Sequence, residues 1–162
     1  MITLKTILCP TDFSEPSLAA TRYALEFART FDAALHLLYV IEDPMLFSPA
    51  FGGYAPNPDE FEAYAKTGLE NWISPEDAGA VPIVRRWVHG RPFLGILRDA
   101  ERHDVDLIVM GTHGRGFLPH ILLGSVAERV VREASCPVLT VRTEGFQYEA
   151  IDTGAGGEGN PV

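Results

Sequence analysis

Glycines interrupt the segment between residues 111 and 125 at positions where backbone N–H groups could meet an anion. They are Gly111, Gly114, Gly116 and Gly124. Glycine can adopt φ > 0, and its missing side chain lets another group approach the main chain. Exposed N–H groups in such a loop, followed by a helix N-terminus, form an anion site. The segment therefore indicates phosphate binding, although a glycine-rich loop can also serve only to turn the chain.

The spacing of these glycines excludes two common phosphate-binding loops. A Walker A loop ends in Gly-Lys followed by Ser or Thr, and this segment has no such ending. The order Gly111-x-x-Gly114-x-Gly116 also differs from the Gly-x-Gly-x-x-Gly order of dinucleotide-binding folds. The expected chemistry is a phosphate cradle made of main-chain donors.

The longer spacing Gly111-x₂-Gly114-x₉-Gly124-Ser125 resembles the nucleotide-binding pattern of the universal stress protein family. Residues 7–14 and 136–141 carry the same resemblance, which extends over about residues 1–143. It implies an ATP-binding stress-response protein that acts as a nucleotide-dependent switch through an unidentified protein partner. Any Mg²⁺ would arrive with the nucleotide. Residues 1–143 are expected to form one nucleotide-binding domain, and residues 144–162 a disordered tail rich in glycine and acid.

Apolar runs alternate with helical patterns along the chain. The runs predict strands at residues 6–9, 34–41, 81–88, 105–110 and 138–141. Periodicity predicts helices at residues 15–30, 59–73 and 125–134, with another starting at Pro92. Gly68 weakens the second of these helices. Residues 74–80 are expected to turn, and the proline-rich residues 42–58 to form a long loop: a nucleotide lid, a flexible insertion or a dimer contact.

Caps and apolar stripes position the predicted helices. Ser14 is the expected N-cap of the first helix, and Ser125 with Glu128 fits a capping box at the last. The stripes expected to face the sheet are Ala20, Ala24, Phe27 and Phe31; Phe61, Ala65 and Trp72; Phe93, Ile96, Leu97 and Ala100; and Val126, Val130 and Ala134.

This alternation predicts an α/β fold, an open doubly wound five-stranded parallel sheet with helices on both faces. The family resemblance implies the strand order 3-2-1-4-5 and a Rossmann-like architecture of the adenine nucleotide alpha hydrolase type. In that order the direction of winding reverses between the strands at 6–9 and 105–110. Ligands of such sheets bind at this point, beyond the carboxyl ends of the strands. The loop after the first strand and the glycine loop should therefore meet there.

The candidate nucleotide-binding residues come from these loops and from the end of the second strand. Asp12 could accept hydrogen bonds from a ribose or an amine, as the resemblance implies, or could cap the following helix. Val40 would offer backbone and apolar surface to adenine. The full set is Pro10, Thr11, Asp12, Val40, Met110, Gly111, His113, Gly114, Arg115, Gly116, Gly124, Ser125 and Val126.

Two side chains of the phosphate end have competing roles. The Ser125 hydroxyl could bond a phosphate oxygen or cap its helix. Arg115 could pair with a phosphate or remain solvated. His113 and His120 lack zinc-like spacing, so no metal site is predicted.

No catalytic residues are predicted, because the sequence presents no Ser-His-Asp or Cys-His arrangement and no kinase or P-loop motif. One alternative to the switch is an enzyme, either a slow ATPase or a related nucleotide hydrolase. Another is a nucleotide-free interaction dimer, which the intact glycine pattern disfavours.

Charge limits the partners that this chain can bind. A net charge of −9 and a pI near 4.9 argue against nucleic acid and anionic membranes. An acidic protein that binds a nucleotide must then compensate the phosphates locally, through N–H donors, Arg115 or a helix dipole. No signal peptide and no apolar run of roughly 20 residues is present, so a cytoplasmic protein is expected.

Five polar or thiol-bearing positions within or beside the predicted strands need a role. Cys9 and Cys136, placed at opposite edges of the sheet, are expected to be reduced, buried thiols. His36 is expected to be a satisfied polar residue of the core. Arg85 and Arg86 should lie on an exposed edge strand, where their charge discourages further pairing.

The strand near residues 137–142 should form the other sheet edge. Its apolar character makes self-pairing about a two-fold axis plausible. The family resemblance also implies a dimer through this strand, so a homodimer is expected.

Overall fold

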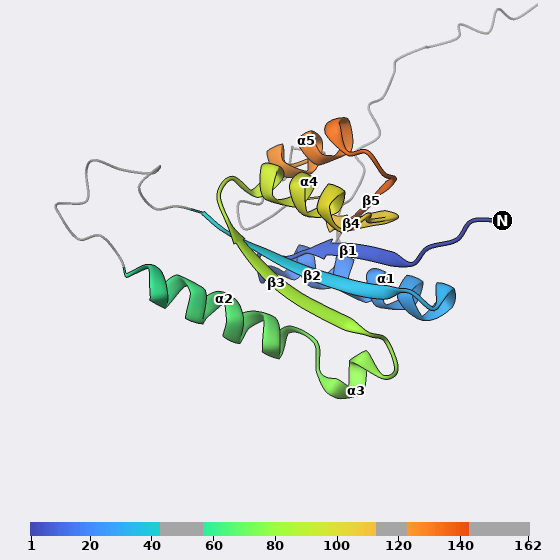
Figure 1. Cartoon of the computed structure of the whole chain (residues 1–162), viewed down its shortest axis with the longest axis horizontal. Helices are drawn as coiled ribbons and strands as arrows, with labels where there is room; N and C mark the ends of the chain where they lie inside the picture. Colours follow the sequence, from blue (N-terminus) through green and yellow to red (C-terminus); the bar gives the residue numbers. More distant parts are fainter. Residues whose placement is uncertain (43–56, 113–122, 143–162) are drawn as a thin grey trace, which may run out of the picture.

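The computed structural model describes residues 1–42, 57–112 and 123–142, and these residues form a parallel sheet between two layers of helices (Figure 1). The strands are β1 (Thr6–Pro10), β2 (Ala34–Ile41), β3 (Ile83–His89), β4 (Leu107–Gly111) and β5 (Val138–Val141). They lie in the order β3-β2-β1-β4-β5, and every neighbouring pair is parallel. The predicted α/β fold and strand order are confirmed. The predicted tail and most of the predicted loop 42–58 lie outside the described residues.

The helices are α1 (Glu15–Phe31), α2 (Pro58–Trp72), α3 (Pro75–Ala78), α4 (Pro92–Arg102) and α5 (Ser125–Glu133). The short α3 lies where the sequence predicted only a turn. None of these helices in the described ranges is both long and apolar enough to cross a bilayer.

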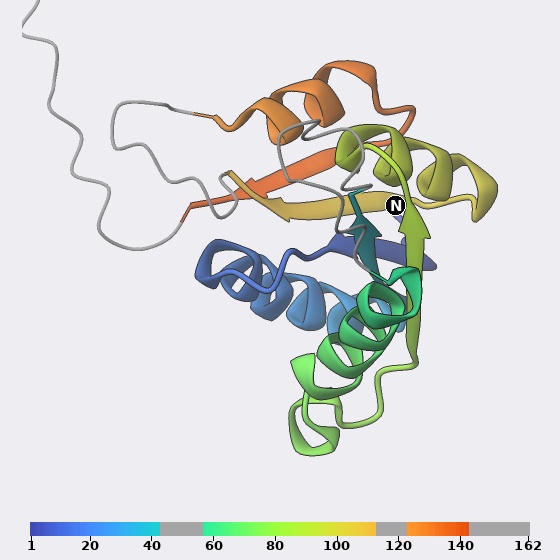
Figure 2. The same ribbon diagram turned by 90° about the vertical axis from the view of Figure 1, so that its left-hand side faces the viewer.

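Helices cover both faces of the sheet (Figure 2), and each face carries its own hydrophobic core. Successive strand residues point to opposite faces. In β1, Ile7 and Cys9 therefore pack with α1 and α2, whereas Leu8 packs with α4 and α5. The helices present the expected stripes, of which Ala20, Ala24, Ala65, Ile96, Ala100 and Val130 are buried and the other positions are partly buried. Asp99 is a buried charge that the predicted stripe of α4 did not include.

The two cysteines do not lie at opposite edges of the sheet as predicted, because β1 is the central strand. Cys9 is fully buried, its Sγ lies 3.5 Å from Thr21 Oγ1, and burial raises the pKa of its thiol to about 12. Burial likewise raises the pKa of Cys136, which is partly exposed before the edge strand β5. Neither residue has the lowered pKa of a reactive thiolate.

Arg85 and Arg86 do lie on an edge strand, but they are not the free edge charges that the sequence predicted. Arg86 donates from Nε to Asp99 Oδ1 at 3.0 Å and from Nη2 to Asp99 Oδ2 at 2.6 Å. The Asp99 side chain is only 4% exposed, so this pair is largely withdrawn from water. Arg85 points to the other face and donates from Nε to the Leu69 carbonyl at 3.0 Å. One arginine thus ties β3 to α4, and the other ties it to α2.

His36 adjoins the same buried pair and is partly exposed rather than fully in the core. Its Nδ1 lies 3.0 Å from Arg86 Nη2, and its ring stands edge-on to that of His103 at 5.8 Å. His103 Nε2 in turn lies 3.6 Å from Asp99 Oδ1. Desolvation lowers the pKa of His36, as do the positive charges of Arg86 and His103, while Asp99 opposes them.

Acidification should weaken the fold through His36. Because its folded-state pKa lies below the ordinary value of 6.5, the unfolded chain takes up a proton first as the pH falls. The free energy of unfolding should therefore decrease as the pH drops below 6.5 toward the folded-state pKa. The free energy of unfolding of a His36→Asn variant is compared with its own value at about pH 8. On acidification it should decrease less than that of the unaltered protein. Urea titrations between about pH 8 and 5 measure this, and parallel curves would refute it.

Candidate functional site

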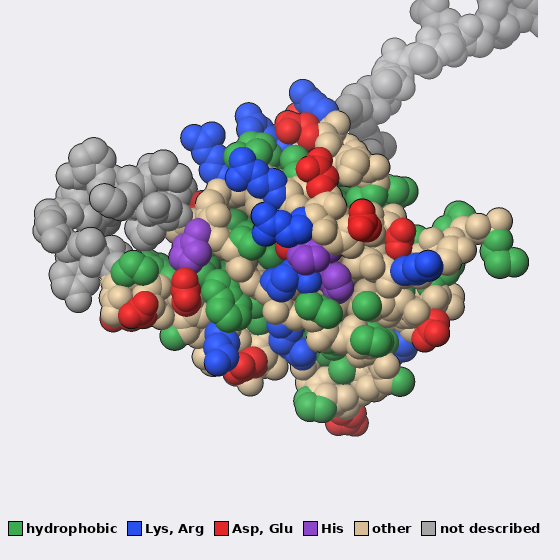
Figure 3. Space-filling model, in the orientation of Figure 1, with side chains coloured by type: hydrophobic (Ala, Val, Ile, Leu, Met, Phe, Trp, Pro, Cys, Tyr) green, Lys and Arg blue, Asp and Glu red, His purple; other side chains and the backbone are tan. Residues whose placement is uncertain are grey.

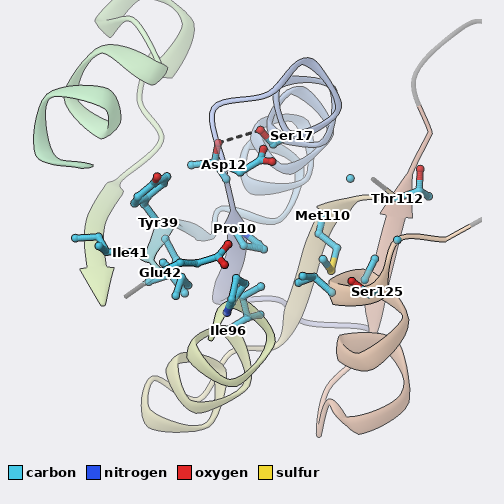
Figure 4. A pocket seen from close by; sticks show the side chains of 18 of the residues that line it. Pro10, Asp12, Ser17, Tyr39, Ile41, Glu42, Ile96, Met110, Thr112 and Ser125 are labelled. Carbon is cyan, nitrogen blue, oxygen red and sulfur yellow. Dashed lines mark hydrogen bonds between the residues drawn. The ribbon is translucent and has the colours of Figure 1, made fainter. Parts of the chain in front are cut away.

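A cavity of about 570 Å³ opens beyond the carboxyl ends of β1, β2 and β4 (Figure 4). That volume suits a small organic ligand. Nine predicted site residues line it: Pro10, Thr11, Asp12, Val40, Met110, Gly111, Gly124, Ser125 and Val126. The other four, His113, Gly114, Arg115 and Gly116, lie outside the described residues. The structure therefore brings together segments that are separated by about a hundred residues, at the point where the winding of the sheet reverses.

The rest of the lining was not predicted from the sequence. It comprises Ser17, Leu38, Tyr39, Ile41, Glu42, Phe61, Pro92, Ile96, Thr112 and Ala127. The sequence did mark two of these residues as apolar and inward-facing, because Phe61 and Ile96 belong to stripes that were expected to face the sheet. Both lie near the start of their helices, and a helix that follows a parallel strand starts at the carboxyl edge of the sheet.

Several helices direct their N-terminal turns at the cavity. Ser17 of α1, Pro92 of α4 and Ser125 of α5 all lie in first turns and all line it. A helix N-terminus carries roughly half a positive charge, together with N–H groups that have no acceptor within the helix. The cavity is thus electrostatically suited to an anion even in an acidic protein.

Charged side chains give the cavity two different ends. Asp12 and Glu42 approach it from the ends of β1 and β2, whereas Ser125 lies across from them on α5 (Figure 4). Arginine side chains gather on the outer surface of α4 and α5 and the turn before α4 (Figure 3). The exposed ones are Arg91, Arg98, Arg102, Arg129 and Arg132. None of these arginines lines the cavity, whereas the carboxylates of Asp12 and Glu42 make the side formed by β1 and β2 suited to groups that donate hydrogen bonds.

The turn after β1 fixes Asp12 through its own hydrogen bonds. Asp12 Oδ1 accepts from the Ser14 N–H at 3.0 Å and also from the Ser14 hydroxyl. Thr11 Oγ1 accepts from the Phe13 N–H at 3.0 Å and lies 3.0 Å from Ser17 Oγ. Ser14, as predicted, is the N-cap of α1. Asp12 therefore shapes the turn before the cap and does not cap the helix itself.

Two glycines of the motif have roles that differ from the expected ones. A Cβ atom on Gly111 would lie 2.9 Å from the Pro16 carbonyl oxygen, so this glycine lets the first turn of α1 pack against β4. Gly124 has φ −67° and ψ 155°, which any residue can adopt, and needs no positive φ. Its N–H donates to the Thr112 carbonyl at 2.7 Å and closes the base of the segment between them.

The predicted capping box at Ser125 is wrong. Gly124 is the N-cap of α5, Ser125 is the first helical residue, and no side chain caps the helix. Ser125 is exposed and lines the cavity. Ser125 was predicted either to cap its helix or to bond a phosphate oxygen, and the structure excludes the capping role.

Comparison with known proteins gives a consistent result. Residues 3–142 match the universal stress protein family. Universal stress protein MJ0531 of Methanocaldococcus jannaschii is 38% identical over 139 residues, which are 85% of this chain and 82% of that protein.

Solved structures agree with the sequence comparison. Universal stress protein UspA from Lactobacillus plantarum is 29% identical, with a TM-score of 0.77 over 88% of this chain and 100% of its own. A universal stress protein crystallised in complex with cAMP is 26% identical, with a TM-score of 0.63 over 87% of this chain and 98% of its own.

Replacing each of the two helix-start serines by alanine should separate a capping role from a ligand-facing one. Ser14→Ala removes a cap and should lower the free energy of unfolding by about 0.5–2 kcal/mol. Ser125→Ala removes no cap and should change it by less than about 0.5 kcal/mol. Urea denaturation of the two variants measures the difference, and an equal loss in both would contradict the assignment of Gly124 as the cap.

Proposed function

Because the chain belongs to the universal stress protein family, we propose that its cavity binds an adenine nucleotide, with ATP as the ligand, and acts as a nucleotide-dependent switch in a stress response. One observation carries this proposal. A single cavity joins Asp12 and Val40, at the ends of adjacent strands, to the N-terminus of α5. The relative crystallised with cAMP supports a cyclic or linear adenine nucleotide as the class of ligand.

The adenosine half of the ligand would occupy the side formed by β1 and β2. Val40, Ile96 and Met110 offer apolar surface for the base. Asp12 would accept a hydrogen bond from a ribose hydroxyl, as its carboxylate lies at the cavity and is oriented by Ser14. Val40 lies near the end of β2, and its backbone groups could form hydrogen bonds with the edge of adenine.

The phosphates would lie at the start of α5. The backbone N–H groups of Ser125 and Val126 are in its first turn and have no acceptor within the helix. The Ser125 hydroxyl, which does not cap, would donate to a phosphate oxygen. Gly114, Arg115, Gly116 and His113 join this half of the site by virtue of the sequence pattern. Mg²⁺ would enter with the nucleotide, since phosphate oxygens are its preferred ligands.

A slow nucleotide hydrolase is the alternative to a switch. The cavity holds two carboxylates, Asp12 and Glu42, that could orient a water molecule. Production of ADP or AMP over time by the pure protein distinguishes the two, because a switch retains the nucleotide intact.

We also propose that two copies of the chain pair through β5 and its flanking residues 137–142. β5 forms one edge of the sheet and has a partner strand on one side only within the described residues. A homodimer should therefore sediment at twice the 17.8 kDa of the chain at micromolar concentration. Sedimentation as a monomer would exclude this pairing.

Gly124→Val should weaken ATP binding while leaving the fold intact. Valine adopts the extended backbone of Gly124, but its branched side chain would occupy the approach to the first turn of α5. We expect calorimetry to show at least about a tenfold loss of affinity, equivalent to about 1.4 kcal/mol. Ser135→Val, at an exposed position in the connection after α5, is the matched control and should bind as the unaltered protein does. Equal affinity in both variants, or no ATP binding by the unaltered protein, would refute the assignment.

A further inference from the structure

Phe13 lies between the candidate ligand residue Asp12 and the cap of α1, in a backbone conformation that only its surroundings can explain. Its φ of 63° is left-handed, which a bulky residue rarely adopts. Strain of this kind persists where neighbouring contacts over-determine it. The contacts that hold Phe13 therefore also hold the turn that presents Asp12.

Those contacts come from elsewhere in the chain. The Phe13 ring stacks on Tyr39 of β2, with centroids 4.7 Å apart and planes 9° apart. On α2, Tyr64 meets it edge-on at 5.7 Å, and Trp72 is tilted against it at 5.4 Å. Two of its three aromatic neighbours in the described residues thus belong to α2.

Gly68 shows that α2 is shaped around this ring. A Cβ atom at Gly68 would lie 2.4 Å from Phe13 Cζ and 2.5 Å from Cε2. Glycine in the interior of a helix is unfavourable, and the sequence alone offered no reason for it. In the structure, Gly68 lets the tip of the Phe13 ring lie directly against the backbone of α2.

A chain of hydrogen bonds joins the same two parts of the molecule. Trp72 Nε1 donates to Thr21 Oγ1 at 2.9 Å, and Thr21 Oγ1 donates to the Ser17 carbonyl at 2.8 Å. Ser17 Oγ lies 3.0 Å from Thr11 Oγ1, which accepts from the Phe13 N–H at 3.0 Å. Both the ring and the backbone of Phe13 are therefore connected to α2.

Besides Phe13, the helix α2 contacts Arg85 and His89 of β3 and Tyr39 of β2 through Leu69, Glu62 and Tyr64, but few of its own residues are buried. Of its fifteen residues only Ala65 and Leu69 are buried. Elements with few buried apolar contacts open at lower free energy than the core. The contacts with Phe13 thus add to a small set that docks α2 on the sheet, and α2 in turn supplies two of the three aromatic contacts of Phe13 in the described residues.

We propose that Phe13, seated on Gly68, is a positioning residue that couples the docking of α2 to nucleotide binding. The docked helix holds Phe13 in its left-handed conformation, and this conformation presents Asp12 to the ribose. Coupling is reciprocal, so the nucleotide also strengthens the docking of α2. A change that draws α2 from the sheet lowers nucleotide affinity. This inference rests on the proposed function of the cavity.

Gly68→Ala is the direct test. Its new Cβ would collide with the Phe13 ring, while alanine itself favours the helix. Thr67→Ala, at the exposed neighbouring position, also favours the helix and is the matched control. We expect Gly68→Ala to weaken ATP binding by about tenfold or more in calorimetry, and Thr67→Ala to change it by less than about twofold. Equal affinities in the two variants would overturn the coupling.

A double-mutant cycle separates positioning from a general loss of stability. In a Phe13→Ala background the ring is absent, so Gly68→Ala should no longer change the affinity for ATP. Additive effects of the two substitutions would overturn the proposal, because residues that act through one contact are not additive. If Gly68→Ala fails to fold, Tyr64→Ala removes the edge-on contact without adding bulk and should still weaken binding several-fold. Unchanged ATP binding by folded Tyr64→Ala would count against the coupling.

Hydrogen exchange distinguishes failure of the coupling from failure of the proposed function. ATP should slow amide exchange across residues 58–72 in the unaltered protein and in Thr67→Ala, and less so in Gly68→Ala. If the unaltered protein binds ATP but α2 exchanges at the same rate with and without it, the coupling is wrong and the proposed function stands. If the unaltered protein binds no ATP, the proposed function fails and the coupling to nucleotide fails with it. Exchange at residues 12–14 without ligand then decides the remaining claim: faster exchange in Gly68→Ala than in Thr67→Ala supports positioning of the turn by α2, and equal rates overturn it.

Discussion

The chain leaves β1 toward a helix on one face of the sheet and leaves β4 toward a helix on the other face. This divergence determines where the protein can hold a ligand. The two strands are neighbours and parallel, but α1 packs on one face of the sheet and α5 on the other. Right-handed crossovers require this divergence once the strand order reverses between them. Where the winding diverges in this way a cavity can form beyond the carboxyl ends of the strands, and in the described residues a cavity lies there.

The same geometry gives the cavity its charge. Helices that follow parallel strands begin at the carboxyl edge, so their N-termini converge on the opening. The lining contains no Lys or Arg among the described residues, and main-chain dipoles and N–H groups without a helical acceptor can take their place in compensating an anion. On the opposite side, Asp12 and Glu42 bring two carboxylates to the cavity.

Support for the turn at Asp12 comes from a distance along the chain. The left-handed Phe13 is an intrinsically unfavourable residue at that position, and α2 accommodates it by omitting a side chain at Gly68. A left-handed phenylalanine and a glycine inside a helix are each unfavourable alone, and the contact between them explains both. The Arg86–Asp99 pair is similar, since a buried carboxylate on α4 is tolerable only because β3 brings a guanidinium to it. In both cases the edge of the fold that includes β3 and α2 is fixed by specific contacts rather than by extensive apolar burial.

Local signals in the sequence were sufficient to predict the strands, most helix starts and the turn after β1. Apolar runs, the Ser14 cap and the proline at the start of α4 act within a few residues, so they can be interpreted without knowledge of the rest of the chain. The resemblance carried by the glycine pattern supplied the strand order, which spacing alone does not contain. The sequence did not predict that Gly124 rather than Ser125 caps α5, that Arg86 pairs with Asp99, or why residue 68 is glycine. The ion pair and the ring contact depend on segments that only the tertiary structure brings together, and their free energy exists only once the distant partner is in place. The cap of α5 is local and depends on the residue at which that helix begins.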